Sequence, residues 1–123
     1  RWAPSADTLL LFNQARMRID SEDGRLADSA PRRSTTLFLS QKLPLGLQAS
    51  LAQHWVGGFR WLGWSNALPM QRRLDLRLAY AFRSGPNKGE IALVSQNIRG
   101  PYSEFRTDYV FERRSFVSLS LEF

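Results

Sequence analysis

The chain has 123 residues, the size of one ordinary domain, with 43% hydrophobic and 23% charged residues, which excludes an intrinsically disordered protein. No apolar run approaches the roughly 18 to 20 residues of a membrane-spanning helix, which excludes a helical membrane protein. The mean hydropathy of -0.33 does not exclude a transmembrane β-barrel, because lipid-facing and lumen-facing residues alternate along its strands. The absence of cysteine removes disulfides, thiolate metal sites and cysteine nucleophiles.

The formal net charge is +6, and nearly all the basic residues are arginines. Such a charge suits nucleic acid and equally suits the phosphate-rich head groups of lipids and lipopolysaccharide in an outer leaflet. No aromatic-rich ribonucleoprotein motif or other oligonucleotide-binding signature supports a nucleic-acid partner, so we do not expect one. The net charge by itself therefore indicates a negatively charged partner but does not identify it.

The first half of the chain predicts three strands. Residues 8–19 are rich in β-forming residues but leave the facing of the side chains uncertain. Residues 35–43 place Leu37 and Leu39 on one face, with Phe38 out of pattern. Residues 46–57 also alternate, with Gln53 as a polar interruption of the apolar face and His54 on the opposite face. These patterns favour strands that are apolar on one side only.

The cleanest pattern lies in residues 72–83. Five apolar side chains alternate there with charged or small ones, whereas a helix would scatter them around its circumference. The expected apolar face holds Leu74, Leu76, Leu78, Tyr80 and Phe82, and the opposite face holds Arg73, Asp75, Arg77, Ala79 and Ala81. The sequence therefore predicts a strand with one lipid-facing or core-facing side.

Two more strands complete the prediction. Residues 90–98 are β-rich, again with uncertain facing. At the end of the chain Val117, Leu119, Leu121 and Phe123 share one face, and Phe116 is an exception to the alternation. The alternation alone does not decide between a membrane and a soluble sheet. Together with the connections, the aromatic residues and the terminal phenylalanine, it leads us to expect an all-β, antiparallel, up-and-down transmembrane β-barrel segment of about six strands, occupying residues 1–123 as one unit.

The connections between these strands alternate in length. The stretches 20–34, 58–71 and 99–113 are long, whereas 44–46 and 84–89 are short. In an up-and-down sheet every second connection lies at the same end, and outer-membrane barrels have short periplasmic turns and longer extracellular loops. Aromatic residues near the expected strand ends, at Trp55, Phe59, Trp61, Trp64, Tyr80 and Phe82, suit interfacial girdles.

Residues 35–123 resemble the C-terminal end of a TonB-dependent outer-membrane receptor, a plugged barrel of 22 strands that imports scarce nutrients. Three stretches carry this resemblance: residues 73–80, residues 89–98 together with Tyr102, and residues 113–123. The resemblance implies an outer-membrane location and uptake of a nutrient such as a siderophore. It also implies that Arg73, Asp75 and Arg77 face the lumen and that Leu74, Leu76, Leu78, Tyr80 and Phe82 face lipid.

The closing strand also resembles the signal that the barrel assembly machinery recognises on incoming barrel proteins. An exposed last strand offers unpaired backbone groups to a partner strand, and its lipid-facing side chains supply specificity. The residues that carry this expected assembly signal are Val117, Leu119, Leu121 and Phe123. The alternative to an assembly signal is an ordinary last strand of a soluble sheet that happens to end in phenylalanine.

The sequence departs from the family in two respects. It has no counterpart of the N-terminal plug domain, through which alone TonB would be contacted, and six strands cannot close a barrel, which takes roughly eight. We therefore expect a fragment, a truncated product or one piece of an assembly that relies on the remaining barrel strands and plug. Such a chain is not transport-competent alone.

No motif predicts an enzyme, a cofactor site or a metal site. The single histidine, His54, offers neither a metal cluster nor a base-nucleophile pair. The acidic residues Asp20, Glu22, Asp23 and Asp28 lack the glycine and final glutamate of a calcium loop. Asn97 and Tyr102 are expected to fix a strand end. The alternative function is a soluble, lipocalin-like β-barrel that binds a small apolar ligand, with the Leu74 to Phe82 face turned inward.

Overall fold

The computed structural model describes residues 2–61, 66–104 and 106–122. Predictions that involve Trp64 or Phe123 therefore lie outside the described residues. The described part contains nine strands, one short helix and one 3-10 turn. The strands are β1 (Trp2–Ser5), β2 (Thr8–Arg16), β3 (Arg33–Lys42), β4 (Leu47–Val56), β5 (Gln71–Ser84), β6 (Asn87–Gln96), β7 (Tyr102–Ser103), β8 (Val110–Phe111) and β9 (Arg114–Glu122). The helix α1 covers Gly24–Ala27, and the 3-10 turn η1 covers Pro44–Gly46.

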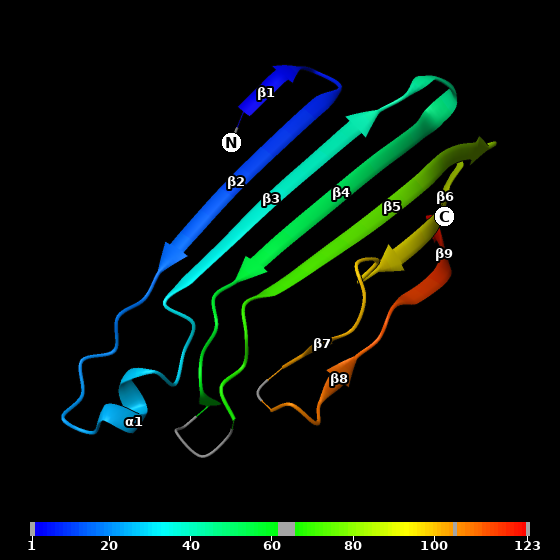
Figure 1. Cartoon of the computed structure of the whole chain (residues 1–123). Helices are drawn as coiled ribbons and strands as arrows, with labels where there is room; N and C mark the ends of the chain where they lie inside the picture. The colour runs from blue at the N-terminus through cyan, green and yellow to red at the C-terminus, as the bar shows by residue number, and fades with distance from the viewer. Residues whose placement is uncertain (1, 62–65, 105, 123) are drawn as a thin grey trace.

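Seven strands form one antiparallel sheet in the order β1-β2-β3-β4-β5-β6-β9, and β7 pairs with β8 in a small separate hairpin. Neighbouring strands of the large sheet are neighbours along the chain, as in an up-and-down meander (Figure 1). The predicted all-β, antiparallel fold is confirmed. Within the described residues the sheet is open, with β1 at one edge and β9 at the other.

The alternation of short and long connections is confirmed. Short turns join β1 to β2, β3 to β4 and β5 to β6, whereas the connections 17–32, 57–70 and 97–113 are long. Figure 1 shows the long connections together at one end of the sheet and the short turns at the other. The first long loop contains α1, and the third contains the β7-β8 hairpin.

Several predicted boundaries were wrong by a few residues. The strand expected at 8–19 ends at Arg16, because the register reaches Arg16↔Arg33 there and one further backbone bond, Met17 to Arg32, closes the ladder. The strand expected at 90–98 covers Asn87–Gln96, because the hairpin pairs Ser84 with Asn87. The short strands β1, β7 and β8 were not predicted, since two to four residues are too few to show alternation.

The strand register divides the six long strands into two faces. Leu74, Leu76, Leu78, Tyr80 and Phe82 of β5 lie on one face of the sheet, which we call the apolar face. Residues that pair with them on β4 and β6, and the partners of those residues on the next strands, lie on the same face. The apolar face includes Leu10, Phe12, Leu37, Leu39, Leu47, Leu51, Trp55, Leu74, Leu76, Leu78, Tyr80, Phe82, Ile91, Leu93, Val117, Leu119 and Leu121. This register settles the facing of β2 and β6, which the sequence left uncertain.

The opposite side, the polar face, carries small and charged side chains. It includes Thr36, Ser40, Gln48, Ser50, Ala52, His54, Gln71, Arg73, Asp75, Arg77, Ala79, Glu90, Ala92, Arg114, Ser118 and Ser120. Phe38 and Phe116, the two aromatics out of pattern, lie on this face as well. The alternation is therefore clearest in β5 and β9, whereas β2 places Leu9 and Leu11 on the polar face as well.

Six of the described residues are buried, and three of them, Ser40, Ala79 and Ala92, lie on the polar face. Ala79 and Ala92 are 2% and 1% exposed, whereas their chain neighbours Leu78 and Leu93 on the apolar face are 48% and 53% exposed. No second layer covers the apolar face within the described residues, as Figure 1 shows. The sheet therefore leaves a row of large apolar side chains open on β5, β6 and β9. Contiguous exposed apolar surface of this kind commonly marks a site of contact with lipid or with another protein.

One close contact on the apolar face fixes the β5-β6 hairpin. Gly89 lies directly opposite Phe82, and a Cβ at Gly89 would meet the Phe82 ring at 2.3 Å. The ring therefore lies over the glycine, an arrangement that shields a side-chain gap in a sheet. Tyr80 stacks beside Phe82 at 6.2 Å between ring centroids. This aromatic pair lies at the short-turn end of the apolar face, where the sequence predicted an interfacial girdle.

Candidate functional site

The three charged residues predicted to face the lumen all lie on the polar face, but they do not form one cluster. Arg73 makes a two-point ion pair with Asp75, through Nε to Oδ1 at 2.9 Å and Nη2 to Oδ2 at 2.8 Å. Arg77 instead pairs with Glu90 of β6. The two arginines therefore pair with different carboxylates, and Asp75 turns both of its oxygens toward Arg73.

Arg77 and Glu90 form an ion pair although they are not directly opposite each other: Arg77 lies in the same row of the ladder as Val94, and Glu90 lies in the same row as Ala81. Between these rows Ala79 and Ala92 lie directly opposite each other. Their small side chains leave room for the longer Arg77 and Glu90 side chains to meet above them. This arrangement accounts for the burial of both alanines on a face that carries no second layer within the described residues.

Asn97 links the end of β6 to this polar face. Its backbone N–H donates to Asp75 Oδ1 at 2.8 Å, and its side-chain Nδ2 donates to the Phe111 carbonyl at 2.8 Å. Its φ of 56° lies in the left-handed region, which asparagine tolerates better than most residues. The predicted role of Asn97 in ending a strand is confirmed, since β6 stops at Gln96.

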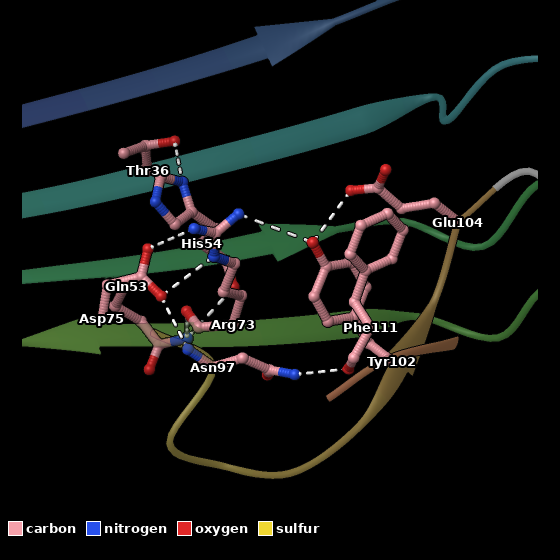
Figure 2. Close-up of polar contacts among 9 residues, drawn as sticks. All are labelled: Thr36, Gln53, His54, Arg73, Asp75, Asn97, Tyr102, Glu104 and Phe111. Carbon is pink, nitrogen blue, oxygen red and sulfur yellow. Dashed lines mark hydrogen bonds and ion pairs between the residues drawn. The ribbon is translucent and has the colours of Figure 1, made fainter. Parts of the chain in front are cut away.

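Tyr102 belongs to the third long loop, and its side chain lies between Arg73 of the sheet and two other residues of the same loop, Glu104 and Phe111. Figure 2 shows its hydroxyl between the Arg73 guanidinium and the Glu104 carboxylate: it accepts from Arg73 Nη1 at 3.5 Å and donates to Glu104 Oε1 at 2.9 Å. Its ring stacks on Phe111 with centroids 5.5 Å apart. Burial, the hydrogen bond to Glu104 and the charge of that carboxylate together raise the pKa of Tyr102.

His54 and Gln53 have different surroundings although they are chain neighbours. His54 lies on the polar face, where its Nδ1 is 3.1 Å from the Thr36 hydroxyl (Figure 2). Gln53, the polar residue on the apolar face, is buried, and its amide donates to the backbone carbonyls of His54 and Arg73. These bonds explain how a polar side chain is accommodated among leucines.

A pocket of about 430 Å³ lies on the polar face at the long-loop end of the sheet. Strands β4 and β5 contribute polar-face residues to it, and each of the three long loops contributes at least two more. The lining residues are Ser29, Ala30, Pro31, His54, Val56, Phe59, Trp61, Gln71, Arg73, Tyr102 and Glu104. The Gln71 side chain also bonds the Ser103 carbonyl, which holds the third loop against β5.

The residues predicted to face lipid or to form an assembly signal lie on the apolar face. Leu76, Leu78 and Tyr80 are more than two-fifths exposed, and on β9 Val117 and Leu119 are exposed by 64% and 63%. Leu74 and Phe82 share this face by register. Leu121 lies there too, whereas Phe123 falls outside the described residues.

Several residues of the polar face and its pocket were not predicted from the sequence. Glu90 could have been found from the β5-β6 hairpin, because the short turn fixes the register that places it near Arg77. Glu104 and Phe111 belong to a long loop without periodicity, and no local pattern indicates that they contact Tyr102.

Among the described residues, no group of three or more His, Cys, Asp or Glu side chains is placed to hold a metal ion. No helix within the described ranges is long and apolar enough to cross a membrane.

Comparison of the chain with protein families, with curated proteins and with solved structures finds no match.

Proposed function

We propose that this chain forms part of the wall of a transmembrane β-barrel in a bacterial outer membrane. The apolar face contacts lipid, the polar face lines the lumen, and the long loops lie on the extracellular side. In this arrangement each strand contributes alternately to two environments, as barrel strands do. The chain's role is to carry a lipid-compatible outer surface and a hydrated inner surface.

The observation that carries this proposal is the contrast between the two faces. The apolar face extends across six strands, and many of its large side chains are exposed, most of them on β5, β6 and β9. The long loops fold over the opposite face, where Phe59, Tyr102 and Glu104 join polar-face residues around the pocket. In a soluble, lipocalin-like barrel the polar face would be the outer one, and loops would cover the mouth of the apolar interior instead.

The sequence resemblance supports a more specific proposal. Residues 73–80, 89–98 and 113–123, which resemble the C-terminal end of TonB-dependent receptors, correspond to segments of β5, β6 and β9. We propose that the chain is a barrel segment of such a receptor and takes part in nutrient uptake. Its open edges mean that further strands, and a plug, would have to complete the transporter.

Membrane partition tests this proposal directly. The chain is expressed behind a secretion signal in a Gram-negative host, and the outer-membrane fraction is run on a denaturing gel with and without boiling. We expect the chain in that fraction, with a mobility that changes on boiling because a folded barrel wall resists the detergent at room temperature. The strand content of the purified protein is checked by circular dichroism.

A different result would contradict the proposal. If the chain stays soluble and monodisperse without detergent, the apolar face must be covered by protein, and the lipocalin-like alternative gains support. Receptor function needs a separate test, because membrane insertion alone does not distinguish a receptor from other barrels. For that test, the chain is expressed with a plug and the missing strands, and nutrient uptake is measured.

A further inference from the structure

We propose that the pocket under the three long loops binds a small organic cation with an aromatic body, such as an aryl-alkyl ammonium ion. This inference extends the proposed function by naming a ligand class for the long-loop end. It depends on the geometry of the pocket and not on membrane insertion, so the two proposals can fail separately.

The pocket has the construction of a ligand site. Its volume of about 430 Å³ falls within the range of small-molecule sites, roughly 300 to 1,000 Å³. Segments far apart in the sequence meet there: residues 29–31, Phe59 and Trp61, and Tyr102 and Glu104 from the loops, over a floor from β4 and β5. Three loops that converge on one cavity can enclose a ligand from several sides.

The charges around the pocket favour a cation. Four ionisable side chains line it: His54, Arg73, Tyr102 and Glu104. Arg73 is neutralised by its two-point ion pair with Asp75. No ion pair among the described residues involves Glu104, whose carboxylate accepts a hydrogen bond from the Tyr102 hydroxyl. The carboxylate of Glu104 is therefore the uncompensated charge at this site.

The aromatic lining suits the same ligand class. Phe59, Trp61 and Tyr102 contribute aromatic side chains to the cavity wall. Aromatic faces attract cations, most strongly where water is partly excluded, and they also pack against an aromatic ligand body. A carboxylate beside such a wall provides a counter-charge for an ammonium group, and the apolar wall contacts the rest of the molecule.

An anionic ligand fits the geometry less well. Arg73 is the obvious anion-binding side chain of the pocket, but its Nε and Nη2 atoms already contact both Asp75 oxygens. Its Nη1 atom points to the Tyr102 hydroxyl (Figure 2). An incoming carboxylate or phosphate would have to displace Asp75 and would approach Glu104, a like charge.

The experiment compares three ligands that share one body and differ in charge. Phenethylammonium, 2-phenylethanol and 3-phenylpropanoate are titrated into the full chain, folded in detergent micelles, with binding followed by ligand-observed NMR. We expect phenethylammonium to bind at least about tenfold more tightly than the alcohol, as expected for a partly desolvated cation–π and carboxylate contact, and the carboxylate to bind most weakly.

The variant Glu104→Gln tests the source of this selectivity. We expect it to lower the affinity for phenethylammonium about tenfold, bringing it close to that of the alcohol. The matched control is Glu112→Gln, which removes one negative charge from the same long loop at a residue that does not line the pocket. We expect Glu112→Gln to leave the affinity unchanged.

Three results would overturn the inference. These are equal binding of the three ligands, tightest binding of the carboxylate, and an equal effect of the two variants, which would indicate a general charge effect. The charge series on the unaltered chain remains informative even if Glu104→Gln misfolds. Membrane partition is measured separately, so charge-selective binding by a soluble chain would refute the barrel proposal and leave the ligand class standing.

Discussion

Asn97 links strand β5 to the far end of the third long loop. It lies at the end of β6, is 2% exposed, and bonds Asp75 on β5 and the Phe111 carbonyl near the end of the same loop. Its Oδ1 has no partner within the described residues, which is a rare condition for a buried side-chain atom. This residue therefore holds the third long loop over the polar face through its backbone amide and its side-chain nitrogen.

Tyr102 allows a test of the polar cluster by pH. Burial first, and then the hydrogen bond to Glu104, raise its pKa above the ordinary value of a tyrosine. A raised folded-state pKa means that the stabilisation is complete below about pH 10, where an unfolded tyrosine ionises, and is lost as the pH rises through the folded-state pKa. We expect the 295 nm absorbance difference between the chain and its Tyr102→Phe variant to show a midpoint above pH 10.

The variant Glu104→Gln should lower this midpoint, because it removes a neighbouring negative charge and keeps an oxygen that accepts the hydrogen bond. Glu112→Gln serves as the control, with the same charge change away from the contact. A Tyr102 midpoint at or below pH 10, or equal shifts in both variants, would show that the contact in Figure 2 is absent in solution.

At the scale of elements, β9 offers the sharpest test of which face meets lipid. Leu119 and Ser118 are adjacent and exposed, and they point to opposite faces of the same edge strand. An arginine on the lipid-facing side of a barrel costs about 2–4 kcal/mol near the bilayer midplane. We expect Leu119→Arg to destabilise the bilayer-inserted protein by that amount, and Ser118→Arg to change its stability by less than about 0.5 kcal/mol, as surface substitutions generally do.

Unfolding by urea from lipid vesicles measures both variants. Both substitutions add one positive charge at adjacent positions of the same strand, so a general effect of charge would be equal in the two variants. If both arginines are tolerated equally, the apolar face does not lie in lipid. A large loss with Ser118→Arg alone would reverse the assignment of the two faces.

The long strands could be predicted from the sequence because side chains on a strand alternate between two environments. In β5 the five apolar positions from Leu74 to Phe82 were enough to fix both faces. In β6 they were not, because Ala92 and Val94 are apolar residues on the polar face, where the Arg77–Glu90 pair covers the alanine row. The alternation of β6 was therefore hidden, because Ala92 and Val94 gave its polar face an apolar sequence.

The candidate site was less predictable, since its residues are brought together by loops. Arg73 and His54 could be placed on one face by period two, and the structure confirms this. Their contacts with Tyr102, and through it with Glu104 and Phe111, depend on how the segment 97–113 folds back. That path is set by Asn97 and by the Gln71 bond to Ser103, which leave no periodic signal.

At the scale of the whole molecule, the two open edges matter most. β1 pairs with β2 only between Trp2↔Leu10 and Ser5↔Thr8, so the outer side of β2 beyond Leu10 has no partner strand within the described residues. β9 likewise pairs only with β6 in this part of the chain. Five successive antiparallel pairings separate β2 from β9, so β9 and the uncovered part of β2 run in opposite directions.

Because β2 and β9 run in opposite directions, β9 of one sheet can pair antiparallel with the uncovered part of β2 of another sheet. In that arrangement the apolar faces of the two sheets lie on the same side. Such head-to-tail contacts close into rings where the geometry permits. In lipid the unpaired N–H and C=O groups of an open edge cost several kcal/mol each, so a single open sheet is not a stable membrane structure. We therefore expect the chain folded in detergent to sediment as an oligomer and not as a monomer.

Amide hydrogen exchange along β9 shows whether its edge is the contact. In an edge strand every second N–H points away from the neighbour, so an open β9 exchanges rapidly at alternate residues from Arg114 to Glu122, whereas a β9 paired on both sides is protected at nearly all of them. We expect the protected pattern in the oligomer. An oligomer with alternating protection would place the contact on the apolar face instead, and a detergent-solubilised monomer would show that the edge does not need a partner.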